Sequence, residues 1–336
     1  MKRKLSALLI ALCLLLSACS AAPAKEEATT PTEYQRAYTP ITRIDHCVLE
    51  PDDRERLSEK DMLAFRSLTE SMLARRDEIT VTPETVSVNV LLDLLRESPY
   101  YYFLREAKID GNTVRFTYAY SPEKQQQMLS FIDEQMLRIA NHEASESDNT
   151  LDVILKIYLA VTHEMTYDNK RTDNKELGSP LFVYPADEIY KALRDKKSLC
   201  YGFAYVLRFA LLQRGIDCFC VYGLCNAHND GHEWIIFRYD DMWFHCDPAW
   251  DRVSEDYAKL IHFGKTDDER KADTLDMEDF ASYHETTYSD VKCTDDRFSI
   301  LRGIVRFTYV NDHRFYMIDR DGKEYFFDTE SFSFVD

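Results

Sequence analysis

A long apolar helix followed at once by three short strands is the feature that most constrains the fold of this chain. Apolar residues recur at helical spacing over residues 199–214, and Gly215 is positioned to end the helix. Three apolar segments then predict strands at residues 217–224, 233–239 and 242–247. Because an apolar helix face must be buried against another layer, these segments predict a helix packed on an antiparallel sheet.

Cys200 stands in the first turn of the predicted helix, for which Ser198 is the predicted N-cap. The partial positive charge and the unpaired amides of a helix N-terminus favour a thiolate over a thiol, and the thiolate is the nucleophile. The same amides could hold a developing oxyanion. We therefore predict that Cys200 is a catalytic nucleophile, with a small core residue as the alternative.

His232 and Asp247 lie on the last two predicted strands, which are joined by the turn Asp240-Asp241. If that turn has two residues, His232 and Asp247 share one face of the sheet, one diagonal step of roughly 7–8 Å apart. A loop with an odd number of residues would put them on opposite faces. On one face, the imidazole can take the thiol proton and the carboxylate can fix the tautomer of the imidazole.

The residues around these three side chains resemble motifs of the transglutaminase-like superfamily. The motifs are Cys200-Tyr201-Gly202-Phe203-Ala204, Val221-Tyr222-Gly223, Gly231-His232-Glu233-Trp234 and Trp243-Phe244-His245-Cys246-Asp247-Pro248-Ala249-Trp250. The resemblance covers about residues 151–264, and Glu233 departs from it because the family usually has a small residue after the histidine.

The resemblance implies a papain-like site that forms a thioester with an acyl group and passes it to an amine or to water. It carries over Cys200 as the nucleophile, His232 as the general base and then acid, and Asp247 as the residue that orients His232. The family also has a side-chain oxyanion donor, for which Tyr184 is the candidate in this sequence.

The first residues read as an export signal. Three basic residues precede an apolar run that ends at Leu16 and is shorter than the roughly 20 residues needed to cross a bilayer. The sequence Leu16-Ser17-Ala18-Cys19 resembles a bacterial lipobox, which implies removal of residues 1–18 and diacylation of Cys19. Two acyl chains would anchor the protein stably at the outer face of the cell membrane, with residues 19–50 as a tether. A plain secretory signal cleaved after Ala18 is the alternative.

Charge and cysteine content narrow the classes of partner and cofactor. Without the signal, 38 basic residues face 59 acidic ones, a balance of −21 that argues against nucleic acid as a partner. A zinc site could be built from Cys218, Cys220, Cys225 and His228, but the first two alternate on a predicted strand and the spacing is not that of a finger. We predict core cysteines, with a disulfide as the minor alternative, and neither a metal nor another cofactor.

The rest of the chain divides into regions around the predicted catalytic domain at residues 146–270. Before it, residues 51–145 form an α/β region with helices at 58–76, 86–96 and 122–143 and a hairpin that begins at Tyr100 and turns at Asp110-Gly111. After it, residues 271–336 form a β-rich extension with strands at 298–310, 314–319 and 324–334. A helix at 151–165 and a polar loop at 169–179 lead toward Cys200. The ends could instead be integral parts of one domain.

We therefore expect an α+β fold with a papain-like transglutaminase core, an α/β N-terminal region and a β-rich C-terminal tail. The expected function is cysteine-dependent acyl transfer or amide hydrolysis on peptides or proteins. Two alternatives remain: a catalytically inactive binding module with the same fold, and a cell-wall peptidase. The sequence leaves the substrate, the acyl acceptor and the oligomeric state open.

Overall fold

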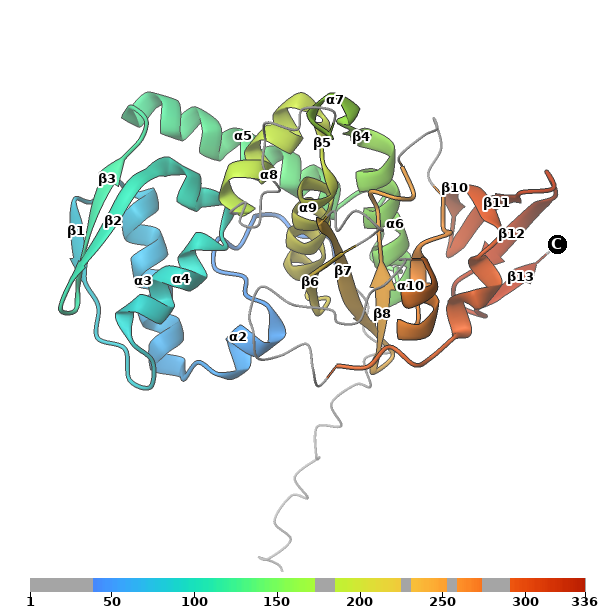
Figure 1. The fold of residues 1–336 in the computed structure, drawn as a ribbon, viewed down its shortest axis with the longest axis horizontal. Helices are drawn as coiled ribbons and strands as arrows, with labels where there is room; N and C mark the ends of the chain where they lie inside the picture. The colour runs from blue at the N-terminus through green and yellow to red at the C-terminus, as the bar shows by residue number, and fades with distance from the viewer. Residues whose placement is uncertain (1–38, 173–184, 225–230, 253–258, 274–290, 336) are drawn as a thin grey trace, which may run out of the picture. The chain divides into compact units, whose positions relative to one another are not determined.

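Helix α9 (Cys200–Gln213) packs against an antiparallel sheet in the computed structural model of the chain (Figure 1). The sheet has the order β6-β7-β8-β9, with strands β6 (Cys218–Leu224), β7 (Gly231–Tyr239), β8 (Met242–Cys246) and β9 (Phe263–Lys265). The structure describes residues 39–172, 185–224, 231–252, 259–273 and 291–335. The predicted α+β fold is confirmed, and the predicted helix and three strands match α9 and β6 to β8 within two residues at each end.

Helix α9 is buried along almost its whole length. Besides the sheet, three helices pack against it: α5 (Pro122–Ala140), α6 (Thr150–Glu164) and α8 (Pro185–Asp195). A helix that is apolar on every side is stable only when it is covered on every side, so these neighbours explain the composition of α9. Its position is therefore fixed by contacts around the whole helix.

The hairpin of β7 and β8 has the register predicted from its turn. Tyr239 pairs with Met242, so Asp240 and Asp241 form a two-residue loop. Both turn residues have positive φ angles, 50° and 59°, as a type I′ turn requires, and aspartate tolerates this conformation better than most residues do. The even loop length puts His232 and Asp247 on the same face.

The N-terminal region has the predicted helices and hairpin. The helices α3 (Glu59–Leu73) and α4 (Val88–Arg96) correspond to the first two predictions, and α5 and α6 to the next two. A short helix, α2 (Pro51–Glu55), precedes them, and strands β1 (Glu78–Thr80), β2 (Leu104–Asp110) and β3 (Thr113–Tyr118) form a sheet of order β1-β3-β2.

The prediction that Tyr100 begins a strand is wrong. The aromatic run belongs to a 3₁₀ helix, η2 (Pro99–Phe103), and the strand begins at Leu104. Pro99 fits the first position of this helix because its φ angle is already helical, and the Ser98 hydroxyl oxygen caps the helix by accepting a hydrogen bond from the Tyr100 amide at 3.3 Å.

The C-terminal segment forms an antiparallel sheet of order β10-β11-β12-β13. Its strands are β10 (Ile304–Asn311), β11 (Arg314–Asp319), β12 (Glu324–Asp328) and β13 (Ser333–Val335). The last predicted strand is therefore two strands, separated by a turn in which Phe332 has a φ angle of 49°. The start of the first predicted strand is a 3₁₀ helix, η4 (Arg297–Leu301).

Short elements complete the surroundings of α9. Strand β4 (Thr166–Tyr167) pairs in parallel with β5 (Lys197–Ser198), and α10 (Asp267–Asp273) follows β9. The first four residues of the predicted loop at 169–179 form α7 (Asn169–Thr172), so that part of the prediction is wrong. Residues 173–179 lie outside the described residues.

A large apolar core connects most of the described elements, and a smaller cluster lies beside β6 and β7. The buried side chains of the large core run from Ile44 in the N-terminal region to Phe327 in β12, and the described residues belong to one compact unit. The domain boundaries at 145/146 and 270/271 stay a prediction. Within the described ranges, every helix is too short or too polar to cross a bilayer.

Candidate active site

Cys200 lies in the first turn of α9, as predicted, where it is the first residue of the helix, and only 7% of it is exposed. The predicted cap is wrong: the N-cap is Leu199, whose side chain makes no capping hydrogen bond. Ser198 instead pairs with Tyr167 in the parallel ladder of β4 and β5, and its hydroxyl donates to the Glu188 carboxylate at 3.4 Å. The helix begins at Cys200, so Ser198 lies one residue before the N-cap position.

Strand β5 and the first turn of α9 approach each other very closely at Gly202. A Cβ atom added to Gly202 would lie 2.0 Å from the Ser198 Oγ and 2.5 Å from the Ser198 Cβ. Because a real Cβ atom does not come so close to another carbon, this position excludes every other residue without a local shift. Glycine at position 202 therefore allows the start of the helix to lie close to β5, and this close approach fixes the position of Cys200.

The predicted contact between His232 and Asp247 is confirmed. The His232 Nε2 and the Asp247 Oδ2 are 2.6 Å apart, and both residues are buried, with 4% and 1% exposure. His232 lies on β7, one of the strands against which α9 packs, and Asp247 directly follows β8. The catalytic roles of Cys200, His232 and Asp247 stay a prediction.

The surroundings of Asp247 keep it ionised. Burial alone would raise the pKa of Asp247, but the charges of His232 and Arg270 and the hydrogen bond with His232 hold it below its usual value. The Asp247 Oδ2 accepts from the Arg270 Nη2 at 2.9 Å, and its Oδ1 accepts from the Trp250 amide at 3.0 Å. An ionised carboxylate only accepts hydrogen bonds, so the His232 Nε2 must carry the hydrogen, which leaves Nδ1 of a neutral ring to accept a proton.

Two tryptophans flank the charged groups. The His232 ring is stacked at 4.7 Å on Trp250 and at 5.9 Å on Trp234, between ring centroids. The Arg270 guanidinium carbon lies 4.2 Å from the ring centre of each tryptophan. Sequence reasoning missed Arg270, because it lies in an acidic segment without a motif and reaches Asp247 only through the fold.

Asp251 is a second buried carboxylate beside the pair. It accepts from the Tyr158 hydroxyl at 2.6 Å and from the His262 amide at 3.1 Å, and its own amide donates to the Asp247 carbonyl. Burial raises the pKa of Asp251 to about 7, against the opposing charge of His262. Asp251 therefore changes charge near neutral pH inside the turn that positions Asp247.

Replacing Asp251 by Asn should flatten the dependence of stability on pH. In the wild type, the folded carboxyl keeps its proton up to about pH 7 while the unfolded one loses it near 3.8, so stability is lost as the pH rises between these values. The loss amounts to a few kcal/mol, since each pKa unit corresponds to about 1.4 kcal/mol. Urea unfolding at pH 5 and pH 8 measures the change in stability. An equal pH dependence in wild type and Asp251→Asn would refute the raised pKa of Asp251.

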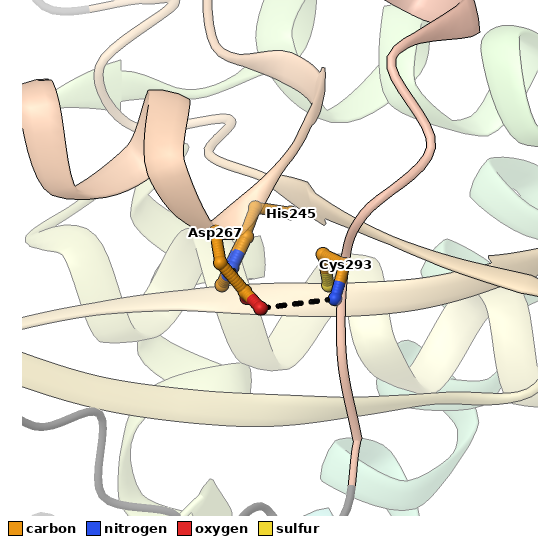
Figure 2. Close-up of side chains that lie close together, drawn as sticks. All are labelled: His245, Asp267 and Cys293. Carbon is orange, nitrogen blue, oxygen red and sulfur yellow. Dashed lines mark hydrogen bonds and ion pairs between the residues drawn. The ribbon is translucent and has the colours of Figure 1, made fainter.

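A further group of possible metal ligands consists of His245, Asp267 and Cys293, whose ligand atoms all lie within 4.8 Å of one another (Figure 2). The Trp234 Nε1 donates to the His245 Nδ1 at 2.9 Å, so the His245 Nε2 carries the hydrogen and donates to Asp267 at 3.0 Å. A cation at that Nε2 would need the ring to lose its last hydrogen. The group therefore fits a structural hydrogen-bond network better than a metal site.

The other cysteines have the character of core residues. The structure describes six cysteines, all of them buried: Cys47, Cys200, Cys218, Cys220, Cys246 and Cys293. Burial raises the pKa of Cys218 and Cys220 well above the usual value, which makes these thiols poor ligands and poor nucleophiles. The other two residues of the possible zinc site, Cys225 and His228, lie outside the described residues. Tyr184, the candidate oxyanion donor, lies outside them too.

Comparison with solved structures gives distant likenesses. They include a transglutaminase (16% identity, 46% of this chain and 46% of that chain, TM-score 0.31). They also include the periplasmic domain of TgpA from Pseudomonas aeruginosa, bound to ethylmercury (18% identity, 42% and 56%, TM-score 0.25). A third is an arylamine N-acetyltransferase from Bacillus cereus with a Cys-His-Glu catalytic triad (12% identity, 59% and 85%, TM-score 0.31). The alignments span about half the length of the first two structures, and none of the three decides a function.

The sequence itself matches a family. No curated protein gives a significant match. Residues 138–248 match the transglutaminase-like superfamily, and this segment contains Cys200, His232 and Asp247. These 111 residues include α6, α8, α9 and the hairpin of β7 and β8. By this match, residues 138–248 of the chain belong to the transglutaminase-like superfamily.

Proposed function

We propose that the chain is a cysteine enzyme that transfers an acyl group from an amide of a peptide or protein to an amine or to water. Cys200 is the nucleophile, His232 the general base and acid, and Asp247 the residue that orients His232. Cysteine-based catalysis is usual in the superfamily to which residues 138–248 belong. The observation that carries the proposal is the buried 2.6 Å contact of Asp247 with His232, which lies on β7, a strand that packs against the helix of Cys200.

The first half of the reaction forms a thioester. The His232 Nδ1 takes the proton of the Cys200 thiol, and the sulfur attacks the carbonyl carbon of the substrate amide. Amides at the start of α9 are suited to stabilise the resulting oxyanion. The imidazolium then gives its proton to the amide nitrogen, the C–N bond breaks, and an amine or ammonia leaves while the acyl group stays on sulfur.

The second half returns the enzyme to its starting state. An amine or a water molecule attacks the thioester carbon and gives a proton to the His232 Nδ1. The C–S bond breaks, and the proton returns to the sulfur of Cys200. Throughout, the Asp247 carboxylate accepts from the His232 Nε2 and stabilises the positive ring without being protonated itself.

An intact-mass experiment tests the proposal. Wild-type protein incubated with glutamine-containing or other amide peptides and a primary amine should convert them to new amides or acids and should carry the mass of one acyl group at Cys200. The Cys200→Ala variant should do neither, because it lacks the sulfur that forms the thioester. Wild type that binds such peptides without any adduct or product would instead favour the inactive binding module.

A further inference from the structure

A buried arginine outside the family match contacts the proposed catalytic carboxylate. Arg270 lies on α10, 22 residues beyond the end of the match at residue 248, and is 1% exposed. Its Nη2 donates to the Asp247 Oδ2, the same oxygen that contacts the His232 Nε2. Because one carboxylate oxygen serves both residues, a movement of Arg270 would change the geometry of the bond to His232.

The side chain of Arg270 is held in a narrow slot between two indoles. Its guanidinium carbon lies 4.2 Å from the ring centre of Trp234 on β7 and 4.2 Å from that of Trp250, which follows Asp247 by three residues. A planar guanidinium can stack on two rings and still donate in its own plane, whereas a lysine ammonium cannot. The two tryptophans therefore aim the Arg270 N–H group at the Asp247 oxygen.

The backbone of α10 is fixed at two points around Arg270. At the start of the helix, Asp267 contacts the His245 Nε2 at 3.0 Å. The Asp267 carboxylate also accepts from the Cys293 amide at 3.2 Å, the bond drawn in Figure 2. At Glu269, the carboxylate accepts from two nitrogens of Arg302 at 2.7 and 2.8 Å. The hydrogen-bond network around His245 thus holds α10 against β8 and residue 293. It thereby fixes the backbone position from which the Arg270 side chain extends.

Several other charged groups face Asp247. His232 reaches it from β7. The charge of His262, in the segment before β9, lowers the pKa of Asp247, and the charge of Asp247 raises the pKa of Asp251 in the same turn. The Tyr158 hydroxyl, from α6, lies 3.2 Å from the Asp247 backbone carbonyl, and its shorter contact, at 2.6 Å, is with the Asp251 carboxylate. Among the described residues, His232 and Arg270 are thus the two side chains that hydrogen-bond to the Asp247 carboxylate.

We propose that Arg270 is a positioning residue of the active site, which holds the Asp247 carboxylate in the orientation that keeps its bond to the His232 Nε2. This inference rests on the proposed function, because it assigns Arg270 a role only if His232 and Asp247 activate Cys200. In this role, Arg270 acts through Asp247 and not on the reacting atoms.

The test measures the alkylation rate of Cys200 by iodoacetamide, with the site identified by peptide mass mapping. Arg270→Met should slow it by about ten- to a hundredfold, since a displacement near 1 Å in an active site can cost that much. Arg270→Lys should recover part of the rate through its charge. Lys156→Met is the matched control, since it removes a buried cation that pairs with Asp148 at 2.7 Å outside the candidate site, and it should change the rate less than about twofold.

A spectroscopic signal separates positioning from mere support of the fold. The hydrogen between the His232 Nε2 and Asp247 should give a far-downfield proton resonance in wild type that is absent from His232→Gln. It should persist in Lys156→Met and Arg270→Lys and be broadened or lost in Arg270→Met. A folded Arg270→Met protein with the wild-type resonance and rate would overturn the inference.

The double variant covers the case in which Arg270→Met does not fold. Asp247→Asn with Arg270→Met removes both buried charges together, and it should react no more slowly than Asp247→Asn alone, because Arg270 acts through Asp247. A further loss of more than about tenfold in the double variant would contradict that route. If wild-type Cys200 itself reacts like an ordinary thiol, the proposed function fails, whatever these variants do.

Discussion

Replacing Asp247 by Asn should lower the turnover of the enzyme, and the alkylation rate of Cys200 at neutral pH with it. An asparagine can turn its amide N–H groups toward the His232 Nε2, which then accepts, so the ring hydrogen moves to Nδ1 and the ring can no longer take the thiol proton there. Loss of the orienting carboxylate in a related triad costs about 10⁴-fold in turnover. We expect a loss of about 10³- to 10⁴-fold here for the same reason.

The same substitution should destabilise the protein. Arg270 is 1% exposed and would lose the carboxylate that accepts its hydrogen bond. Breaking a buried ion pair from one side costs about 3–5 kcal/mol, because the remaining charge stays buried. Urea unfolding measures this loss separately from the loss of activity.

Asp148 offers a matched control for Asp247. It is 3% exposed and pairs with the buried Lys156 at 2.7 Å, outside the candidate site. Asp148→Asn should therefore lose a similar amount of stability and keep the reactivity of Cys200. If folded Asp247→Asn reacted as fast as wild type, or if both variants slowed equally, the orienting role of Asp247 would be refuted.

Replacing Gly202 by Ala should have the second large effect, on both stability and reactivity. The added methyl group would lie 2.5 Å from the Ser198 Cβ, which no rotation of the serine can relieve. We expect a loss of about 1–3 kcal/mol, the range for overpacked interiors. The start of α9 must also move away from β5, and a shift near 1 Å should slow the reaction of Cys200 by about a hundredfold.

Two further variants identify the cause of the Gly202→Ala effect. Adding Ser198→Gly removes the atoms that clash, so the double variant should regain much of the lost stability and rate. Gly303→Ala is the control glycine, since an added Cβ there would meet nothing within 4 Å and the φ angle is not positive. No recovery in the double variant would mean that the close approach of Ser198 is not the reason for the glycine.

Local signals predicted the hairpin and the contact that depends on it. Asp240 and Asp241 favour a two-residue turn, and the period of the strand then fixes which residues share a face. The facing pair His232 and Asp247 follows from those two rules without knowledge of the rest of the fold. The helix that begins at Cys200 could also be predicted from local sequence signals, because its apolar run is long and ends at Gly215.

Tertiary contacts explain the errors and omissions. Ser198 was misassigned as a cap because its partner in the strand pair, Tyr167, lies 31 positions earlier in the chain. Arg270 was missed because its role comes from two tryptophans and a carboxylate on other elements. The expected lipid anchor at Cys19 lies outside the described residues and stays a prediction.

The pH dependence of Cys200 alkylation in the wild-type protein tests the central claim most directly. If His232 and Asp247 activate the thiol, Cys200 should react with iodoacetamide at half its maximal rate well below about pH 8.5, the value for a free thiol. The His232→Gln variant should lose that advantage. A half-maximal rate at or above about pH 8.5 in wild type, unchanged by His232→Gln, would contradict the account.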